Sequence, residues 1–266
     1  MGYEYSTFKI MKNNTKKEFL DKQVMAFSGN NRNSNLLTRH KIIINIITKF
    51  SKRDDNILDI GCFDGKILNT LKKNGYKSLY GVDFSDKSKN SFQDTSIHFA
   101  SCDIEKEEIP FNKKFDVVIF ADVLEHLFSP QTTLYDLRKK MNKNAKIIFS
   151  VPNAGWIVNG ILLSFFPSKL FISTAFGPWG HTYHFTFFQV RKIAGKLKFK
   201  IVKLSGGKNE NNVFKRGLKK VIFDLFLVLT YPLVLVYPQI FSDHIFGVFR
   251  NTDSTLSDNN RFDLGN

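Results

Sequence analysis

Three carboxylates follow short apolar segments of this 266-residue chain, each where a predicted strand ends. They are Asp59, Asp83 and Asp103. Because the carboxyl ends of parallel strands meet at one edge of a sheet, we expect these side chains to share a crevice. A carboxylate accepts hydrogen bonds from ribose hydroxyls or from an exocyclic amine. The spacing therefore predicts a nucleoside-binding site at this edge.

The first of these acids opens a glycine-containing turn, ILDIGCFDG, at residues 57–65. Such a turn lets the backbone approach a ligand closely. A dinucleotide fingerprint that starts at Gly61 would need two further glycines where Phe63 and Lys66 stand. The P-loop pattern, in which Gly-Lys precedes Ser or Thr, does not occur either. The turn therefore favours a nucleoside ligand without a pyrophosphate.

The segments that carry these residues alternate between two hydrophobic periods. Strands are predicted at residues 56–60, 78–82, 97–101, 116–121, 145–151, 199–204 and 244–250, and helices at residues 35–50, 66–73, 130–141 and 187–197. Ser129 before Pro130, and Thr186 with Gln189, are signals of a helix N-terminus. Strands that alternate with helices predict an α/β fold whose sheet is parallel and covered on both faces.

Length and composition fit one globular domain with insertions. Hydrophobic residues make up 42% and charged residues 24% of the chain, which excludes a disordered chain and a polytopic membrane protein. We predict a polar N-terminal arm at residues 1–34, a domain at 35–250 with apolar insertions at 154–179 and 205–243, and a polar tail at 251–266. Two cysteines and no signal-peptide pattern predict a cytoplasmic location.

The glycine turn resembles motif I of the class I S-adenosylmethionine (SAM) dependent methyltransferases, which usually reads D-x-G-x-G-x-G, with Phe63 in place of the middle glycine. Blocks at residues 115–130, 147–153 and 180–201 resemble those of the methyltransferase type 11 group, to which quinone-biosynthesis O-methyltransferases are similar. The resemblance implies SAM as cofactor. It also implies a Rossmann-like, doubly wound, seven-stranded sheet, mostly parallel with an antiparallel last strand, and helices on both faces.

The resemblance further implies a set of cofactor-binding residues: Asp59, Gly61, Cys62, Gly65, Asp83, Phe84, Asp103, Ile104 and Ala121. In this set Asp59 and Gly61 border the methionyl part of SAM, and Asp83 holds the ribose. Asp103 and Ile104 hold the adenine, and the carbonyl of Ala121 accepts from the methionyl ammonium. Two alternatives stay open: Asp59 only orients its loop, and the other two acids only cap helices. The two cysteines are expected to be small packing residues beside the pocket.

Methyl transfer from a sulfonium is an in-line displacement, so nucleophile, methyl and sulfur must be aligned. A hydroxyl acceptor also needs a general base, and histidine is the usual side chain near neutral pH. His126 follows the fourth predicted strand, and His181 and His184 follow the fifth, so all three are candidate catalytic residues at the carboxyl edge. Glu125 is a further candidate. In the alternative, His126 only bonds backbone at a turn and His184 only orients the next helix.

The sequence also restricts the acceptor atom. No [DN]-P-P-[YF] pattern follows the fourth strand, which disfavours methylation of a base or amide nitrogen and favours oxygen. Neither histidine loop contains a metal-ligand cluster, so we expect no metal ion.

Charge provides the remaining indication of partners, because the chain has a formal net charge of +15. Residues 191–220 hold eleven basic residues against one acid and precede an apolar run at residues 221–240. This order is typical of contact with an anionic membrane surface, here at the inner face. The basic stretch lacks an aromatic stacking platform or RNA-binding module, so nucleic acid is not expected. In the alternative, both insertions pack on the domain or on a dimer mate; the sequence leaves the oligomeric state open.

We therefore expect a SAM-dependent methyltransferase that acts on an oxygen of a small-molecule, glycan or lipid-linked acceptor. Two alternatives remain: an NAD-type Rossmann-like oxidoreductase, and a non-catalytic module that binds SAM or a nucleotide. The second is conceivable because Phe63 replaces a motif glycine.

Overall fold

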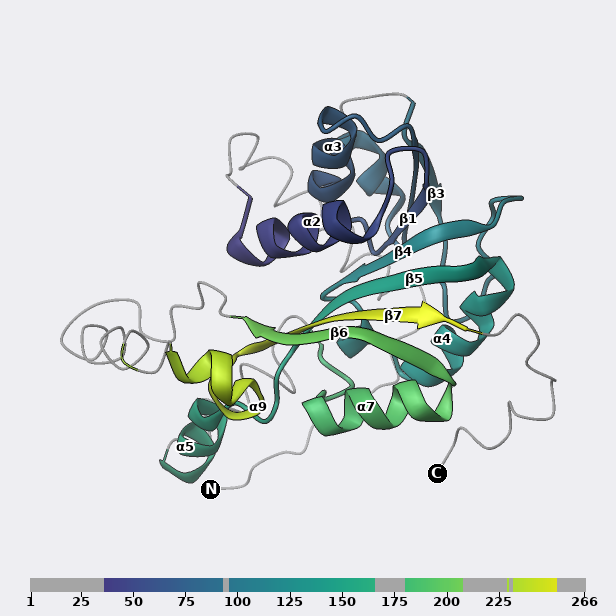
Figure 1. Cartoon of the computed structure of the whole chain (residues 1–266). Coiled ribbons are helices and arrows are strands. Elements are labelled where there is room, and N and C mark those ends of the chain that lie inside the picture. Colours follow the sequence, from purple (N-terminus) through teal and green to yellow (C-terminus); the bar gives the residue numbers. More distant parts are fainter. Residues whose placement is uncertain (1–35, 93–95, 166–179, 208–228, 230–231, 253–266) are drawn as a thin grey trace, which may run out of the picture.

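A computed structural model describes residues 36–92, 96–165, 180–207, 229 and 232–252 of the chain. Within these residues one sheet has the strand order β3-β2-β1-β4-β5-β7-β6 (Figure 1). The strands are β1 (Asn56–Ile60), β2 (Ser78–Asp83), β3 (His98–Ser101), β4 (Phe115–Ala121), β5 (Met141–Pro152), β6 (Phe199–Gly207) and β7 (His244–Asn251). β1 to β5 pair in parallel, whereas β7 is antiparallel to both β5 and β6. The predicted Rossmann-like sheet with an antiparallel last strand is confirmed.

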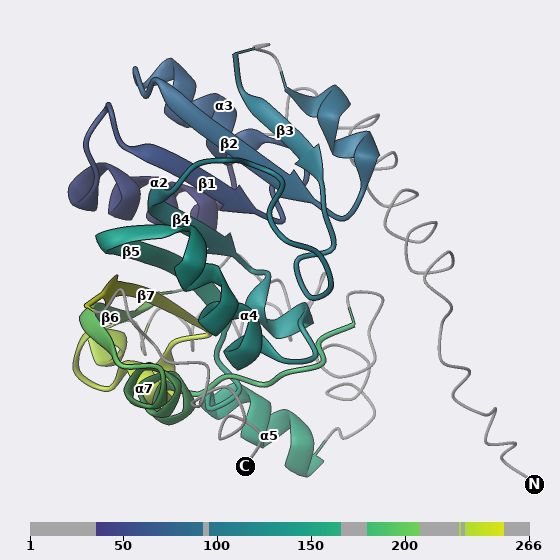
Figure 2. The same ribbon diagram turned by 90° about the vertical axis from the view of Figure 1, so that its right-hand side faces the viewer.

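Helices cover both faces of this sheet (Figures 1 and 2). The α-helices are α2 (Thr38–Phe50), α3 (Lys66–Lys73), α4 (Pro130–Leu137), α5 (Ile157–Phe165), α7 (Phe187–Lys196) and α9 (Pro238–Phe241), and the 3-10 helices are η1 (Asp86–Ser91), η2 (Leu124–His126) and η3 (Arg138–Lys140). α2 and α3 bury their apolar sides in one core, and α4 and α7 bury theirs in another. The sheet separates the two cores.

The central strands are buried on both sides because successive side chains of a strand point to opposite faces. In β1, Ile57 belongs to the core under α2 and α3, whereas Leu58 belongs to the core over α4 and α7. Both side chains are fully buried. This double burial holds the ends of β1 and β4 in fixed positions, and the polar residues of the site follow those ends.

Most predicted elements agree with the structure, and β1 and α3 have the predicted bounds. The helix predicted at residues 130–141 is shorter, because the chain turns through η3 and enters β5 at Met141. Ser129 lies at the predicted N-cap position of α4, with Pro130 at the start of the helix, so this prediction is confirmed. The Ser129 side chain makes no capping hydrogen bond, and its hydroxyl lies 2.7 Å from Oγ1 of Thr132. The hydroxyl thus bonds another side chain instead of a backbone N–H.

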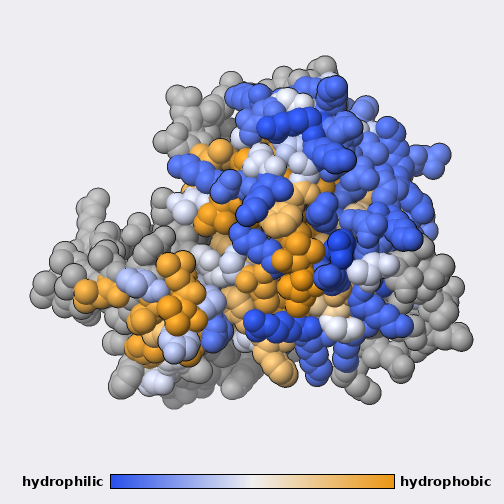
Figure 3. All heavy atoms as spheres, viewed as in Figure 1, coloured by the Kyte–Doolittle hydropathy of each residue, from blue (hydrophilic) through white to orange (hydrophobic). Residues whose placement is uncertain are grey.

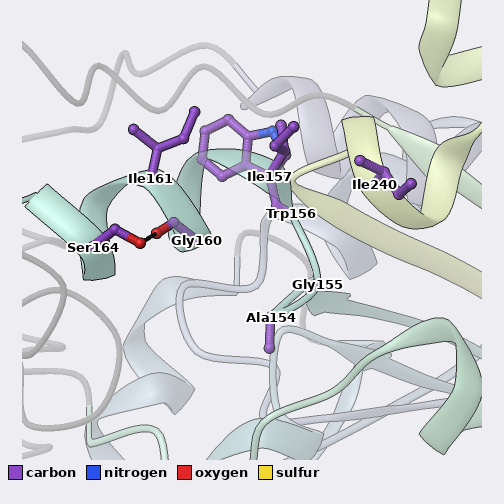
Figure 4. A pocket seen from close by; sticks show the side chains of 8 residues that line it. All are labelled: Ala154, Gly155, Trp156, Ile157, Gly160, Ile161, Ser164 and Ile240. Atoms are coloured by element: carbon purple, nitrogen blue, oxygen red, sulfur yellow. Dashed lines mark hydrogen bonds between the residues drawn. The ribbon is translucent and has the colours of Figure 1, made fainter.

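The parts of the two apolar insertions that are described contain α5 and α9. Between these helices lies a pocket of about 510 Å³ past the end of β5 (Figure 4). Its lining is mostly apolar: Ala154, Gly155, Trp156, Ile157, Gly160, Ile161, Ser164 and Ile240. Figure 3 shows apolar side chains gathered over the same elements. The remainder of both insertions, the predicted arm and nearly all of the predicted tail lie outside the described residues.

Among the described residues, no helix combines the length and the hydrophobicity that are needed to cross a membrane.

The start of α7 provides a test of local stability. Thr186 accepts from the N–H of Gln189 at 3.2 Å, and the Gln189 side chain accepts from the N–H of Thr186 at 2.8 Å, so the predicted capping box is confirmed. We expect Thr186→Ala to lower the free energy of unfolding by about 1 kcal/mol in urea denaturation. Ser129→Ala is the matched control and should change it by less than about 0.5 kcal/mol. Equal losses in the two variants would contradict this assignment.

Candidate active site

The turn after β1 keeps a glycine-like backbone even where glycine is absent. Gly61, Phe63 and Gly65 have φ angles of 68°, 44° and 67°. A left-handed conformation costs a residue with a side chain about 1 to 2 kcal/mol. The turn is held from β2, because the N–H groups of Gly61 and Cys62 both donate to the carbonyl of Val82, at 2.8 and 3.1 Å. Phe63 therefore changes the side chain of the loop but not the path of its backbone.

Close packing explains two of the small residues near this turn. A Cβ added at Gly61 would lie 2.5 Å from Cγ2 of Val123. Cys62 is buried, and its Sγ would lie 2.9 Å from a Cβ at Gly81. Burial raises the pKa of Cys62, and it raises the pKa of Cys102 to about 11, so both thiols stay protonated. Both are packing residues, and the contact of Cys62 with the cofactor stays a prediction.

Asp59 carries a buried oxygen that lacks a donor. The residue is 2% exposed, and its Oδ1 has no hydrogen-bond partner among the described residues. Burial raises the pKa of this carboxyl well above its usual value, and the charges of Asp83 and Asp64 raise it further. An unpaired buried polar atom costs free energy. A ligand ammonium would supply the missing donor, so Asp59 fits the place implied for the methionyl part of SAM.

Asp83 ends β2 and already serves the loop beside it. Its Oδ2 accepts from the N–H of Phe63 at 2.8 Å, and its Oδ1 accepts from the N–H of Ser85 at 2.9 Å. A carboxylate has about four acceptor positions, so both oxygens can accept a further hydrogen bond. Asp83 thus combines a local structural role with the capacity to hold a ribose.

Asp103 lies just past β3, next to the end of β2, because Asp83 and Ser101 are paired. Its carboxylate accepts from the N–H of Glu105 at 3.3 Å and lies 3.4 Å from Nζ of Lys106. The other predicted cofactor residues at these strand ends are half-buried. Ile104 follows β3, Phe84 follows β2, and Ala121 is the last residue of β4. The structure thus brings the three predicted acids to adjacent strand ends, and their contacts with SAM stay predictions.

Asp122 fixes the end of β4 in a polar network. It has a φ of 56°, and its carboxylate lies 2.7 Å from Nε of Arg39 in α2 and accepts from Oγ of Ser150 in β5 at 2.6 Å. Nε2 of His244 lies 4.0 Å from the same carboxylate. The charge of Asp122 is therefore paired, and three elements hold the backbone from which η2 continues.

Glu125, His126 and His181 form one cluster beyond this network. One carboxylate oxygen of Glu125 and one ring nitrogen of each histidine lie within 4.8 Å of one another. The two imidazole rings meet edge to face, with centroids 4.8 Å apart. The backbone carbonyl of Glu125 accepts from the N–H groups of Thr182 and Tyr183, at 2.8 and 3.0 Å. These two bonds join loops that are far apart in the sequence.

The structure brings together only two of the three histidines that were predicted as catalytic candidates. His126 and His181 lie together, whereas His184 is exposed and outside the cluster. Burial and the neighbouring His126 lower the pKa of His181 to about 4, so this imidazole is neutral at physiological pH and a weak general base. Folding brings possible metal ligands from the two loops together, whereas the expectation that no metal ion is bound stays a prediction. The sequence indicated Glu125, His126 and His181 as separate candidates at this edge but not as one cluster.

Several solved structures of methyltransferases share this fold. One comes from the complex between the Haloferax volcanii Trm112 methyltransferase activator and a methyltransferase, with a TM-score of 0.62, 12% identity, and coverage of 91% of this chain and 99% of that one. Another is magnesium protoporphyrin IX methyltransferase from Synechocystis PCC 6803 with bound SAH, with a TM-score of 0.59, 15% identity, and coverage of 90% and 100%. At such identities the likeness shows the fold.

A curated relative corrects the expected partners. The tRNA U34 carboxymethyltransferase of Sulfurimonas denitrificans is 31% identical over 117 residues, which are 41% of this chain and 39% of that protein. The chain thus matches well under half of the relative's length. The finding contradicts our expectation of a small-molecule, glycan or lipid-linked acceptor, a membrane surface and no nucleic acid. The chain lacks an evident stacking module in its basic stretch, but affinity for nucleic acid comes largely from positive charge and does not need such a module.

A substitution at Asp59 can distinguish its two predicted roles, which are binding of the SAM ammonium and orientation of the loop. If Asp59 binds the SAM ammonium, Asp59→Asn should weaken SAM binding about tenfold or more, because a charged hydrogen bond is lost. The ligand-free protein should lose no stability, because the substitution removes an acid that is buried and has an unpaired oxygen. Calorimetric titration with SAM and thermal unfolding measure the two effects. Lower stability with unchanged SAM affinity would instead show that Asp59 only orients the loop.

The contact between Gly61 and Val123 leads to a second prediction. Gly61→Ala places a Cβ 2.5 Å from Val123 at a φ of 68°, so the turn must shift. We expect SAM affinity to fall about tenfold or more, measured by calorimetric titration. Gly195→Ala is the control, because a Cβ there meets nothing within 4 Å. An equal affinity in the two variants would show that the turn does not border the cofactor.

The family comparison agrees with the site and the fold. Residues 20–201, more than half of the chain, match a family model described as a methyltransferase domain. Relatives of the same fold hold SAH, so SAM is the cofactor, and the NAD-type alternative is set aside. The chain therefore belongs to the methyltransferase domain family and is a class I SAM-dependent methyltransferase.

Proposed function

We propose that this methyltransferase transfers its methyl group to a hydroxyl oxygen of an RNA, with tRNA as the acceptor class. The observation that carries the proposal is the position of the cluster of Glu125, His126 and His181. Val123 packs against Gly61 of the cofactor turn, and the cluster begins two residues later. Acceptor-binding groups thus follow directly from the cofactor site.

In this proposal, one group of residues at the carboxyl edge of the sheet binds the cofactor and another binds the acceptor. Bound SAM supplies an electrophilic methyl group on a sulfonium. Asp59 and Asp83 hold its ammonium and ribose, while the cluster holds and orients the acceptor hydroxyl. Transfer joins the acceptor oxygen to the methyl carbon and breaks the carbon–sulfur bond, which leaves its electron pair on sulfur. The hydroxyl proton is released to solvent. Alignment of this kind can lower the activation free energy by about 7 kcal/mol or more.

Two observations support RNA as the acceptor. The relative that matches part of this chain is named for a tRNA U34 reaction. The net charge of +15 favours a polyanion, because phosphate contacts supply most of the affinity of a protein for nucleic acid. Exposed basic side chains gather on α7 and at the start of β6: Arg191, Lys192, Lys196, Lys198 and Lys200.

A fractionated transfer assay tests the acceptor. The chain is incubated with methyl-labelled SAM and, separately, with tRNA, ribosomal RNA, protein, lipid and small-molecule extracts. We expect label in tRNA that nuclease digestion releases as a modified nucleoside, whose mass identifies the transferred group. Asp83→Ala is the control and should lower incorporation about tenfold or more, because the ribose loses its acceptor. Label confined to lipid or to nuclease-resistant small molecules would contradict the proposal.

A further inference from the structure

Glu125 is in a position that needs a positive partner. It is 1% exposed, and neither carboxylate oxygen has a hydrogen-bond partner among the described residues. The nearest paired acid differs: Asp122 is held by Arg39 at 2.7 Å and by Ser150 at 2.6 Å. Arg39 is thus already engaged. A buried carboxylate of this kind either keeps a proton or binds a cation.

Two imidazoles lie beside this carboxylate, close to the spacing that one cation requires. Three ligands that each lie about 2.0 to 2.2 Å from a tetrahedral metal ion are about 3.3 to 3.6 Å apart. The oxygen and the two nitrogens of the cluster lie within 4.8 Å of one another, so side-chain rotations that move the ligand atoms by about 1 Å would close the site. Metal ligation uses a lone pair of a neutral imidazole nitrogen, and each histidine of the cluster places one ring nitrogen within this distance of the carboxylate.

We propose that Glu125, His126 and His181 bind one divalent first-row transition metal ion of the zinc, iron or cobalt class. The acceptor hydroxyl would take a further coordination position, a part of the inference that rests on the proposed function. Two nitrogens and one carboxylate oxygen are typical ligands for these ions, whereas magnesium and calcium prefer oxygen alone. Three protein ligands also leave positions open, as in catalytic sites.

The arrangement of the ligands allows access from one side. Glu125 is buried, whereas His126 and His181 are half-buried, so solvent reaches the two histidines but not the carboxylate. The backbone bonds from Thr182 and Tyr183 to the Glu125 carbonyl hold both loops in register before any ion arrives. A divalent cation lowers the pKa of an oxygen that binds to it. The acceptor hydroxyl would thus lose its proton to solvent without a basic histidine.

Direct metal binding tests the site without SAM or RNA. The full chain, freed of metal by chelation, is titrated with Co2+ and followed by visible absorption, and with Zn2+ by calorimetry. We expect one equivalent of each ion to bind. Glu125→Gln and His181→Ala should each weaken binding about tenfold or more, since loss of even an outer partner of a metal ligand costs about 10- to 100-fold. Glu125→Gln keeps the backbone carbonyl that joins the loops.

His98→Ala is the matched control, because His98 is exposed on β3, three strands from β4 in the sheet. Its metal affinity should equal that of the wild type, and circular dichroism should show folded protein for all variants. Absence of stoichiometric binding, or unchanged affinity in both Glu125→Gln and His181→Ala, would overturn the proposal. Glu125 would then be a protonated buried acid.

The metal titration and the transfer assay test the metal site and the RNA acceptor separately. Stoichiometric Co2+ binding that depends on Glu125 supports the metal site even if tRNA accepts no methyl group. Transfer to tRNA that persists at full rate after chelation, with no metal bound, would uphold the acceptor and overturn the metal site.

Discussion

Two buried carboxylates at the carboxyl edge of the sheet, Asp59 and Glu125, have oxygens to which no described group donates a hydrogen bond. Water cannot compensate them at 2% and 1% exposure, so the ligand-free chain bears an electrostatic cost. Burial of β1 and β4 on both faces supplies the stability that tolerates this cost. In the sequence, Asp59 comes two residues before Gly61 and Glu125 two residues after Val123, and these two residues are in contact. Under our proposals, a ligand would supply the partner of each acid.

The fold converts sequence distance into proximity mainly through backbone bonds. The carbonyl of Glu125 accepts from Thr182 and Tyr183, which brings His181 beside His126. Asp122 adds rigidity, because its carboxylate joins β4 to α2 and β5 through Arg39 and Ser150. Both devices are hydrogen bonds or ion pairs within the protein. They explain how residues on loops can be held with the precision that alignment for methyl transfer demands.

The sequence predicted the elements whose signals are local. The bounds of β1 and α3 follow from apolar periodicity and the flanking glycines, and the capping box of α7 follows from Thr186 and Gln189. Ser129 shows the limit of such local signals. It lies at the predicted N-cap, but its hydroxyl bonds the side chain of Thr132 and not the helix backbone. The acids at adjacent strand ends were predictable from parallel topology. The cluster with His181 was not, because it depends on two backbone hydrogen bonds between loops that no pattern encodes.

The chain leaves β5 and returns before α7 through a pair of fixed points. Asn153 forms an isolated bridge with Phe185, and the N–H of Ala154 donates to the Phe185 carbonyl at 2.8 Å. The bonds from Thr182 and Tyr183 to the Glu125 carbonyl hold the residues directly after His181. Because all of these bonds join main-chain atoms, many side chains between residues 182 and 185 can be exchanged in evolution while the backbone beside His181 keeps its position.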